Sequence, residues 1–229
     1  SGGEDRILKV WDLVTGQEIR TLRGHRGSVT AIAVMPDGRR VVSASADGTL
    51  KEWDSATGRE GSTLSGHGGT VTALTVTPDG RQAVSGSDDR TLKVWNLETG
   101  QEIRTLRGHA LWITALAVTP DGRQVLSASI DEMVKIWDLA IAQETHALWG
   151  HEGAVTAVAV TLDGRQAVSA STDGTLKVWR IAPAVEVTTL FGRAGSVMAV
   201  ALTPDGRQVV SGSDDRTLRV WNLATGQKV

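Results

Sequence analysis

The sequence of 229 residues has no cysteine, a single phenylalanine and only five prolines. The missing cysteine excludes disulfide bonds and thiolate metal sites, which is typical of proteins in a reducing compartment. The apolar stretches fall short of the roughly 18 residues that a membrane helix requires, and the chain shows no signal peptide. We therefore expect a cytoplasmic protein without a membrane segment.

The chain also lacks an excess of charge of either sign. Lys and Arg together number 24 and Asp and Glu 26, which gives a formal net charge of −2. Binding to phosphate groups needs clustered Lys and Arg in excess, so this balance argues against nucleic acid as the main partner. The hydrophobic share of 40% supplies enough apolar material for a globular core.

What the sequence does contain is one unit copied several times. Six tryptophans stand 42 residues apart throughout, and the chain length equals five such periods plus 19 residues. These are Trp11, Trp53, Trp95, Trp137, Trp179 and Trp221. Gly-His recurs at 24/25, 66/67, 108/109 and 150/151, and Pro-Asp-Gly at 36–38, 78–80, 120–122 and 204–206. A fixed period of this length is typical of stacked supersecondary units.

Each period predicts four short strands and three tight turns. In one copy, apolar and β-branched stretches at 29–34, 40–45 and 49–54, with a last one ending at Leu64, are separated by turn-forming residues. Segments this short, broken repeatedly by Gly, Asp or Pro, do not follow the 3.6-residue period of a helix. A four-stranded antiparallel sheet that is apolar on both faces needs cover on both, and a ring of such sheets provides it.

The order of the repeated motifs resembles the WD40 repeat: Gly-His, then Pro-Asp-Gly, then Ser-x-Ser-x-Asp, then Trp-Asp or Trp-Asn. The resemblance covers essentially the whole chain and implies an all-β WD40 β-propeller of four-stranded antiparallel blades, with about 5.5 repeats. In that family the Gly-His and Ser-x-Ser-x-Asp segments lie on the top face of the ring. Because WD40 rings more often have seven blades, and Ser1 falls in the middle of a repeat, we expect an excerpt of a larger ring.

The expected blade boundaries follow from the period. We expect one propeller segment over 1–229, with a partial blade at 1–22, full blades at 23–64, 65–106, 107–148 and 149–190, and a nearly complete blade at 191–229. The repeats contain the motifs Leu-Arg-Gly-His and Val-Thr-Pro-Asp-Gly-Arg-Gln. These motifs are similar to those of long bacterial WD40 arrays, including those attached to signalling ATPases. That similarity implies the sensor region of a larger signalling protein.

Each full period also holds a His, a Ser, an Asp and a Trp at constant spacing. By the same resemblance these form the WD40 structural tetrad, in which the Trp indole donates to the Ser hydroxyl, the Ser meets the His, and the His meets the Asp. The tetrads are His25, Ser43, Asp47 and Trp53; His67, Ser85, Asp89 and Trp95; His109, Ser127, Asp131 and Trp137; and His151, Ser169, Asp173 and Trp179. The last copy keeps Ser211, Asp215 and Trp221, with Arg193 in place of the histidine.

Ser, His and Asp are also the members of a nucleophilic catalytic triad. Catalysis requires one exposed nucleophile with an oxyanion hole and a pocket, whereas here the trio occurs four times, each time with a Trp to occupy the Ser. We interpret the tetrads as structural and expect no enzyme activity, with a hydrolase as the remote alternative.

Metal binding has no support in the sequence pattern. The repeated histidines belong to different blades and so cannot converge on one ion. The Asp-Asp pairs at 88/89 and 214/215 lack further acidic residues at the spacing of a calcium-binding loop. We therefore expect neither a metal nor a cofactor.

One full copy, 107–148, differs most from the others. Trp112 and Ile130 occupy top-face positions without equally large apolar residues in the other copies, and Leu111 and Met133 lie close to them in sequence. Exposed apolar residues grouped on a rigid rim are typical of a binding hot spot. We take these four residues as the candidate partner-binding site; the alternative is that Trp112 folds over its own blade and fills a gap. Trp149 is also unrepeated, and we interpret it as a packing residue.

Two classes of function follow from this pattern. The first is a non-catalytic scaffold or sensor module that binds a protein or peptide on its top face. The alternative is a mainly architectural array that associates with itself, because an incomplete ring leaves open blade edges that invite pairing between chains. A varied, locally apolar top face favours the first class and a uniformly polar one the second, so the apolar residues of the deviant copy favour the first.

Overall fold

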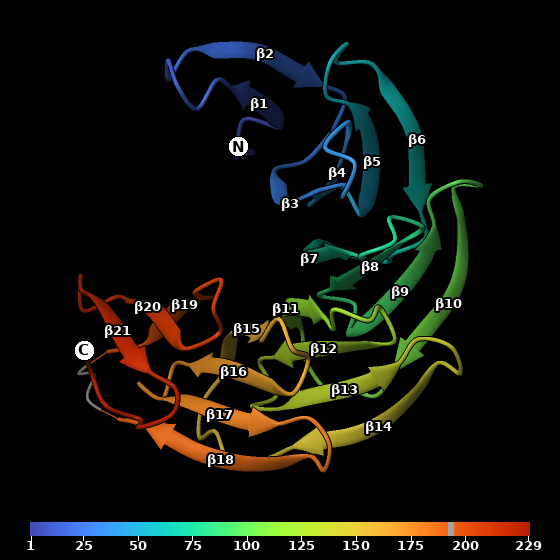
Figure 1. Cartoon of the computed structure of the whole chain (residues 1–229). Helices are drawn as coiled ribbons and strands as arrows, with labels where there is room; N and C mark the ends of the chain where they lie inside the picture. Colours follow the sequence, from blue (N-terminus) through green and yellow to red (C-terminus); the bar gives the residue numbers. More distant parts are fainter. Residues whose placement is uncertain (192–194) are drawn as a thin grey trace. The chain divides into compact units, whose positions relative to one another are not determined.

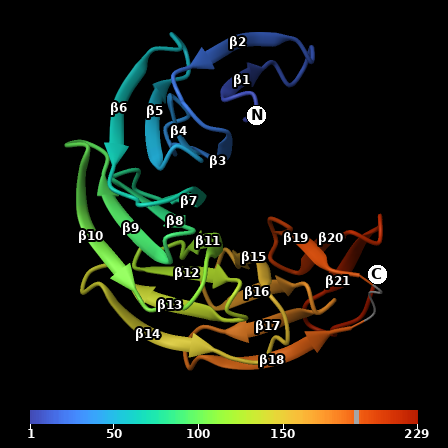
Figure 2. The same ribbon diagram turned by 180° about the vertical axis from the view of Figure 1, so that it is seen from behind.

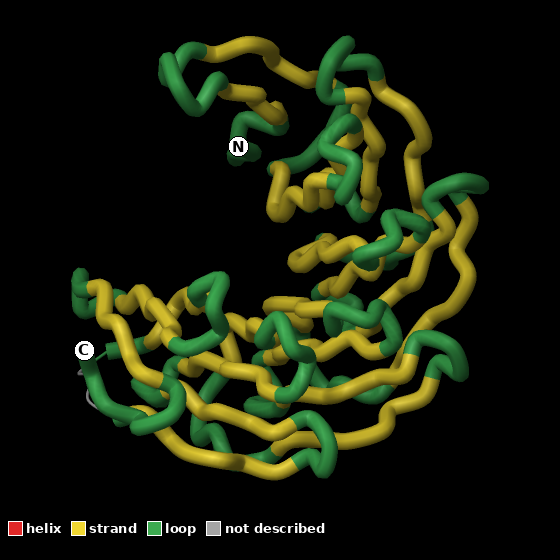
Figure 3. Tube along the Cα trace, in the orientation of Figure 1, coloured by secondary structure: helices red, strands yellow, loops and turns green. Residues whose placement is uncertain are grey.

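The computed structural model describes residues 1–191 and 195–229. These residues form strands and turns, with no helix among them (Figure 3). Within the same ranges no helix is long and apolar enough to cross a membrane. The chain divides into two compact units, residues 1–107 and 108–229.

The first unit holds a two-stranded sheet followed by two four-stranded sheets (Figure 1). The two-stranded sheet is β1 (Ile7–Trp11) and β2 (Glu18–Arg23). The four-stranded sheets are β3 (Val29–Val34), β4 (Arg40–Ser45), β5 (Thr49–Asp54) and β6 (Glu60–Ser65), then β7 (Val71–Val76), β8 (Gln82–Ser87), β9 (Thr91–Asn96) and β10 (Gln101–Arg107). Strands pair in chain order, so that a turn joins each strand to its neighbour.

The second unit holds two four-stranded sheets and a three-stranded one. These are β11 (Ile113–Val118), β12 (Gln124–Ser129), β13 (Val134–Asp138) and β14 (Gln143–Leu148); β15 (Val155–Val160), β16 (Gln166–Ser171), β17 (Leu176–Arg180) and β18 (Val185–Leu190); and β19 (Val197–Leu202), β20 (Gln208–Ser213) and β21 (Leu218–Asn222). The first strand of the middle sheet, β15, lies between β11 and β19 (Figure 1 and Figure 2).

The all-β fold of repeated four-stranded antiparallel sheets is confirmed. The stretches predicted at 29–34, 40–45 and 49–54 coincide residue for residue with β3, β4 and β5, and the stretch ending at Leu64 forms β6. The turns form where the sequence places residues that tolerate a left-handed backbone, such as Gly38 with a φ of 67° between β3 and β4.

Within each unit, apolar clusters between neighbouring sheets form the core, and a tryptophan of one sheet packs on the sheet before it. In the second unit, buried Trp179 of β17 shares a cluster with Leu126, Ala128 and Val134 of the β11–β14 sheet. Trp95 of β9 packs in the same way on the β3–β6 sheet in the first unit. Because a buried Trp removes about 150–250 Å² from water, each of these rings holds two sheets together.

Steric crowding explains the glycine of each Gly-His pair. A Cβ atom on Gly108 would lie 3.0 Å from the Trp137 ring and 3.0 Å from a carboxylate oxygen of Glu144. Glu144 in turn is held by Lys135, whose Nζ donates to it at 2.6 Å. The other glycines of the motif, Gly24, Gly66 and Gly150, are crowded by the glutamates Glu60, Glu102 and Glu186. The loop therefore approaches its own sheet so closely that a side chain at this glycine would force its neighbours to shift.

Replacing Gly108 by alanine tests this close approach. Gly108→Ala is expected to lower the free energy of unfolding by about 1–3 kcal/mol, the usual cost of overpacking, because the buried Trp137 ring has no room to retreat. Gly68→Ala is the matched control, since a Cβ atom there would meet nothing within 4 Å. Urea unfolding followed by circular dichroism measures both variants, and equal stabilities would contradict the steric explanation.

Candidate functional site

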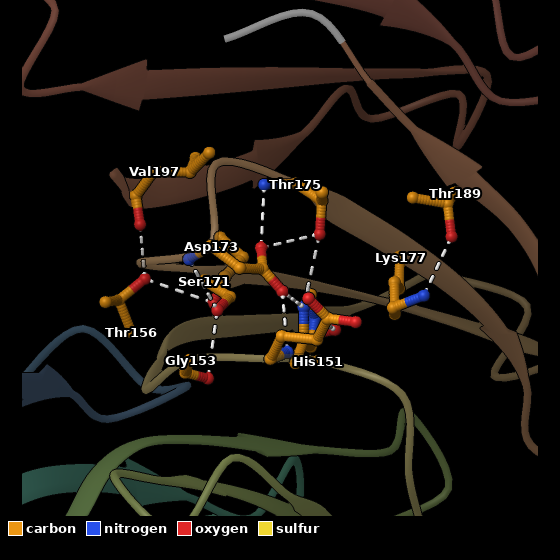
Figure 4. Close-up of polar contacts among 12 residues, drawn as sticks. His151, Gly153, Thr156, Ser171, Asp173, Thr175, Lys177, Thr189 and Val197 are labelled. Atoms are coloured by element: carbon orange, nitrogen blue, oxygen red, sulfur yellow. Dashed lines mark hydrogen bonds and ion pairs between the residues drawn. The ribbon is translucent and has the colours of Figure 1, made fainter. Parts of the chain in front are cut away.

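The four residues of each full tetrad come together within one sheet. Across the four copies, Trp Nε1 lies 2.7–2.8 Å from Ser Oγ, Ser Oγ lies 2.7–2.8 Å from His Nε2, and His Nδ1 lies 2.8–3.0 Å from an Asp carboxylate oxygen. Figure 4 shows one copy, in which the side chains of His151 and Asp173 point toward each other. The tetrad thus ties the loop that carries the His to the middle strands of the same sheet.

The hydrogen bonds of a tetrad run in one direction. An indole N–H only donates, so Trp179 occupies the oxygen of Ser169 and leaves the hydroxyl proton of that serine to donate to His Nε2. The His Nδ1–H then donates to Asp173. This order assigns a neutral histidine with its proton on Nδ1 and an ionised aspartate.

The aspartate is held ionised by several donors. The carboxylate of Asp173 accepts from His151, from the Glu152 N–H at 3.0 Å, and from the Thr175 N–H and hydroxyl at 2.8 and 2.7 Å (Figure 4). Partial burial works to raise the pKa of Asp173, but these hydrogen bonds outweigh it and lower the pKa. The same balance brings the pKa of Asp89 to about 2.

Burial also sets the charge of the histidines. It lowers the pKa of His25, His67 and His151 below the ordinary value, and the facing aspartate only partly offsets this effect. A neutral ring keeps Nε2 free to accept the serine proton, so the lowered pKa and the hydrogen-bond direction agree. The tetrad is therefore a fixed network at neutral pH.

The geometry of Ser, His and Asp matches a catalytic triad, but access to the serine does not. The tetrad serines Ser43, Ser85, Ser127 and Ser169 are fully buried, and each oxygen already accepts from an indole N–H. A nucleophile has to reach its substrate, and these oxygens have no surface to offer one. Within residues 1–191 and 195–229 no group of three or more His, Asp or Glu side chains is placed to hold a metal ion.

Sequence reasoning missed a fifth member of the network. Two residues after the tetrad aspartate, the hydroxyls of Thr49, Thr91 and Thr175 donate to that aspartate at 2.6–2.7 Å. These threonines recur with the same 42-residue period, so the signal was present in the sequence. Met133 takes this place in the β11–β14 sheet, where only its N–H reaches Asp131, at 3.2 Å.

The first and last copies keep part of the network. Trp221 Nε1 donates to Ser211 at 2.9 Å, and Asp215 accepts from the Thr217 hydroxyl at 2.7 Å. Arg193, which replaces the histidine, lies outside the described residues. At the other end Trp11 Nε1 donates to the hydroxyl of Ser1 at 3.0 Å, a pair that the sequence reasoning also missed although it obeys the 42-residue spacing.

Four apolar residues line the end of the β11–β14 sheet where its tetrad loops lie, and we name these four the apolar edge. Trp112 precedes β11, Ile130 follows β12, Met133 precedes β13 and Trp149 follows β14. The Ile130 N–H donates to the Trp112 carbonyl at 3.0 Å. Met133 and Trp149 stand directly beyond the last paired residues of β13 and β14. Every strand of this sheet therefore contributes one residue to the apolar edge.

The apolar edge is open to solvent. Trp112 is 55% exposed, Ile130 36% and the adjacent Leu111 45%, while Met133 is half-buried. The interpretation of Trp149 as a packing residue is wrong, because 70% of its surface is exposed. A side chain as exposed as Trp112 does not fill a gap in its own sheet. The sequence left the exposure of Trp112 open and missed that of Trp149, because a strand end fixes where a residue lies but not what covers it.

The other four-stranded sheets carry mostly small or polar residues at these places. The equivalents are Ser28, Ala46, Thr49 and Ser65 in β3–β6; Thr70, Asp88, Thr91 and Arg107 in β7–β10; and Ala154, Thr172, Thr175 and Phe191 in β15–β18. The strand ends have the same backbone bonds in each case, as the Asp88 N–H donates to Thr70 and the Thr172 N–H to Ala154. The side chains at this end of the β11–β14 sheet therefore differ from those of the other sheets, whereas the backbone hydrogen bonds are the same.

Relatives match this chain over about one repeat each. It is 52% identical over 50 residues to small ribosomal subunit protein RACK1y of Oryza sativa subsp. japonica, and 42% identical over 48 residues to cilia- and flagella-associated protein 52 of Homo sapiens. It is 40% identical over 47 residues to transcription initiation factor TFIID subunit 5 of Caenorhabditis elegans. These alignments cover 20–21% of the chain and only 15%, 8% and 7% of the respective relatives.

The family comparison covers most of the chain. The model described as "WD domain, G-beta repeat" matches residues 16–54, 58–96, 100–138, 142–180 and 184–222. Each match ends at the residue that follows a Trp of the 42-residue series, from Trp53 to Trp221. With the repeated sheets and tetrads already described, these five matches establish that the chain belongs to the WD40 family.

Proposed function

We propose that this chain is a non-catalytic scaffold that binds a protein or peptide at the apolar edge of the β11–β14 sheet. WD40 repeat proteins generally act as non-catalytic scaffolds that bind proteins or peptides. The observation that carries the proposal is the exposure of two tryptophans on one sheet end, 55% for Trp112 and 70% for Trp149. Exposed Trp is rare on monomer surfaces and enriched in binding hot spots.

The apolar edge costs its own sheet a hydrogen bond. Met133 stands where Thr49, Thr91 and Thr175 each donate a hydroxyl hydrogen bond to the tetrad aspartate. A typical hydrogen bond contributes about 0.5–1.5 kcal/mol of net stability, and the half-buried thioether of Met133 does not replace it. A residue that gives up such a bond in favour of apolar surface is better explained by contact with a partner.

The framework under the apolar edge is rigid. The Ile130 N–H is bonded to the Trp112 carbonyl, and the Ser129 N–H to the Met133 carbonyl. A surface that is ordered before binding loses little conformational entropy when a partner docks. We further propose two finer roles: a sensor region in a larger signalling protein, and a cytoplasmic location. The similarity of the repeat sequences to bacterial WD40 arrays supports the first, and the absence of cysteine supports the second.

Capture from an extract of the native cell tests the proposal. The tagged chain is compared with the double variant Trp112→Ala and Ile130→Asp, which inserts residues that other copies carry at the same places, Ala154 and Asp88. The partner is expected to be lost while the melting temperature stays unchanged. A matched control, Ser28→Ala with Ala46→Asp, makes equivalent changes on the β3–β6 sheet and should retain the partner. Unchanged capture by the Trp112/Ile130 variant would show that the apolar edge is not the binding surface.

Self-association is the second candidate function, favoured by apolar surface on the two incomplete sheets. Leu218 of β21 is 76% exposed, whereas Leu176 at the same place in β17 is fully buried. Beside the two-stranded sheet, a cavity of about 270 Å³ is lined by residues such as Leu8, Val10 and Val34. The same capture experiment separates the candidates: under self-association the tagged chain recovers untagged copies of itself, and the Trp112/Ile130 changes have no effect.

A further inference from the structure

The chemistry of the partner follows from the charges that flank the apolar edge. Glu132 lies in the turn between β12 and β13, directly between Asp131 and Met133, and is exposed. Glu152 is exposed in the loop that joins β14 to β15. Neither side chain takes part in an ion pair with a cation among residues 1–191 and 195–229. Two exposed carboxylates thus flank an apolar surface.

The loop of Glu152 reaches the same end of the second unit as Trp112. The Thr114 hydroxyl of β11 donates to the Val155 carbonyl of β15, so the starts of these two strands are neighbours. The Glu152 N–H is fixed in turn by Asp173, at 3.0 Å. The loop that carries Glu152 is therefore held by hydrogen bonds next to the apolar edge.

The lysines of the neighbouring strands are already paired. Lys135 and Lys177 donate to Glu144 and Glu186 at 2.6 and 2.9 Å, and both lysines are largely buried. At the place of Glu132, the copies in β7–β10 and β19–β21 carry Arg90 and Arg216 instead. At this turn position the sheet that carries the apolar edge is therefore acidic where two other sheets are basic.

We infer that the apolar edge binds a short segment of another protein in which an aliphatic or aromatic side chain is flanked by Lys or Arg. This inference rests on the proposed function and names the partner's chemistry. The apolar side chain would cover Ile130 and Met133, and the cations would meet Glu132 and Glu152. Indole rings favour the same charge, because the face of a Trp attracts cations. Trp112 and Trp149 therefore add to the selectivity of the carboxylates.

The size of the segment follows from the sheet. Neighbouring strands are about 4.8 Å apart, so the four strand ends span roughly 15 Å. An extended peptide covers about 3.3 Å per residue, and about five residues therefore reach across the apolar edge. A peptide of this length is long enough to place an apolar residue on Ile130 and Met133 and a flanking cation beside Glu132, which lies in the turn between the two middle strands.

Selection from a displayed library of random ten-residue peptides tests the inference. Three purified forms of the full chain serve as targets: the wild type; Glu132→Arg with Glu152→Arg; and Trp112→Ala with Ile130→Asp. The arginines are residues that other copies carry at these places, as Arg90 and Arg26, so the fold should tolerate them. Peptides from the wild type are expected to combine an apolar residue with Lys or Arg, and peptides from the arginine variant to combine it with Asp or Glu.

Affinities of one synthetic wild-type peptide complete the test. Both variants are expected to weaken its binding by roughly 10-fold or more, as loss of a hot-spot contact does. Binding that is lost in the Trp112/Ile130 variant but unchanged in the arginine variant would overturn the inferred chemistry and leave the proposed function intact. Binding that is unchanged in both variants, or selection that enriches no peptide, would overturn the two together.

Discussion

Trp179→Ala is expected to lower the free energy of unfolding by about 3–5 kcal/mol, the usual cost of truncating a buried aromatic side chain. Trp179 is only 2% exposed and shares an apolar cluster with Leu126 and Val134 of the preceding sheet. Its Nε1 also donates to Ser169 at 2.7 Å. The change therefore opens a cavity between two sheets and breaks a buried polar network at the same time.

A second variant separates these two effects. Trp179→Phe keeps an aromatic ring but removes the indole N–H, so its loss of stability should be smaller, about 1–3 kcal/mol for an orphaned buried group and a smaller ring. Trp149→Ala is the matched control, because this tryptophan is 70% exposed and surface changes usually stay within about 0.5 kcal/mol. Urea unfolding followed by circular dichroism measures all three variants. A Trp149 variant as unstable as the Trp179 variants would refute the assigned environments.

His109→Ala is expected to cost about 1–3 kcal/mol, because it leaves polar groups buried without their partner. His109 Nε2 lies 2.7 Å from the Ser127 hydroxyl and its Nδ1 2.8 Å from Asp131. Alanine supplies no atom to either side chain, and the Asp131 carboxylate loses its imidazole donor while the backbone donors from Ala110 and Met133 remain. The loop before β11 should then loosen along with the tetrad.

The same sheet offers its own control for this histidine. His146 lies in β14 with its side chain exposed, so His146→Ala should leave the melting temperature unchanged. Thermal unfolding of the two variants at pH 7.5 compares a network histidine with a solvated one. If His109→Ala melted at the same temperature as the wild type, the tetrad would not be a stabilising network.

Much of the fold could be predicted because each period contains turn-forming residues at the same places. Gly and Asp residues recur where the chain reverses, and the apolar stretches between them match the strands. The tetrad partners were also within reach of the sequence, since their constant spacing and the family resemblance name the same residues. The threonine that follows the tetrad aspartate, as Thr49 does, had the same spacing but no obvious chemistry of its own, and was missed.

Exposure was the property that spacing could not supply. Trp149 and Trp179 are the same residue type only 30 residues apart in the sequence, yet one is 70% exposed and the other 2%. What differs is the surroundings: Trp179 stands inside a strand, against the preceding sheet, whereas Trp149 stands just past a strand end. Whether a residue at a strand end is covered depends on the loops of neighbouring repeats, and these are set by contacts far apart in the sequence.

The division of the tryptophans has an optical consequence. Of the eight, five are at most 3% exposed, whereas Trp11, Trp112 and Trp149 are 41–70% exposed. A water-soluble quencher such as iodide should extinguish the emission of these three and spare the five in the core. Two of the three belong to the apolar edge, so a bound segment would shield them from the quencher. The unlabelled chain thus carries one set of fluorophores that reports docking and another that reports unfolding.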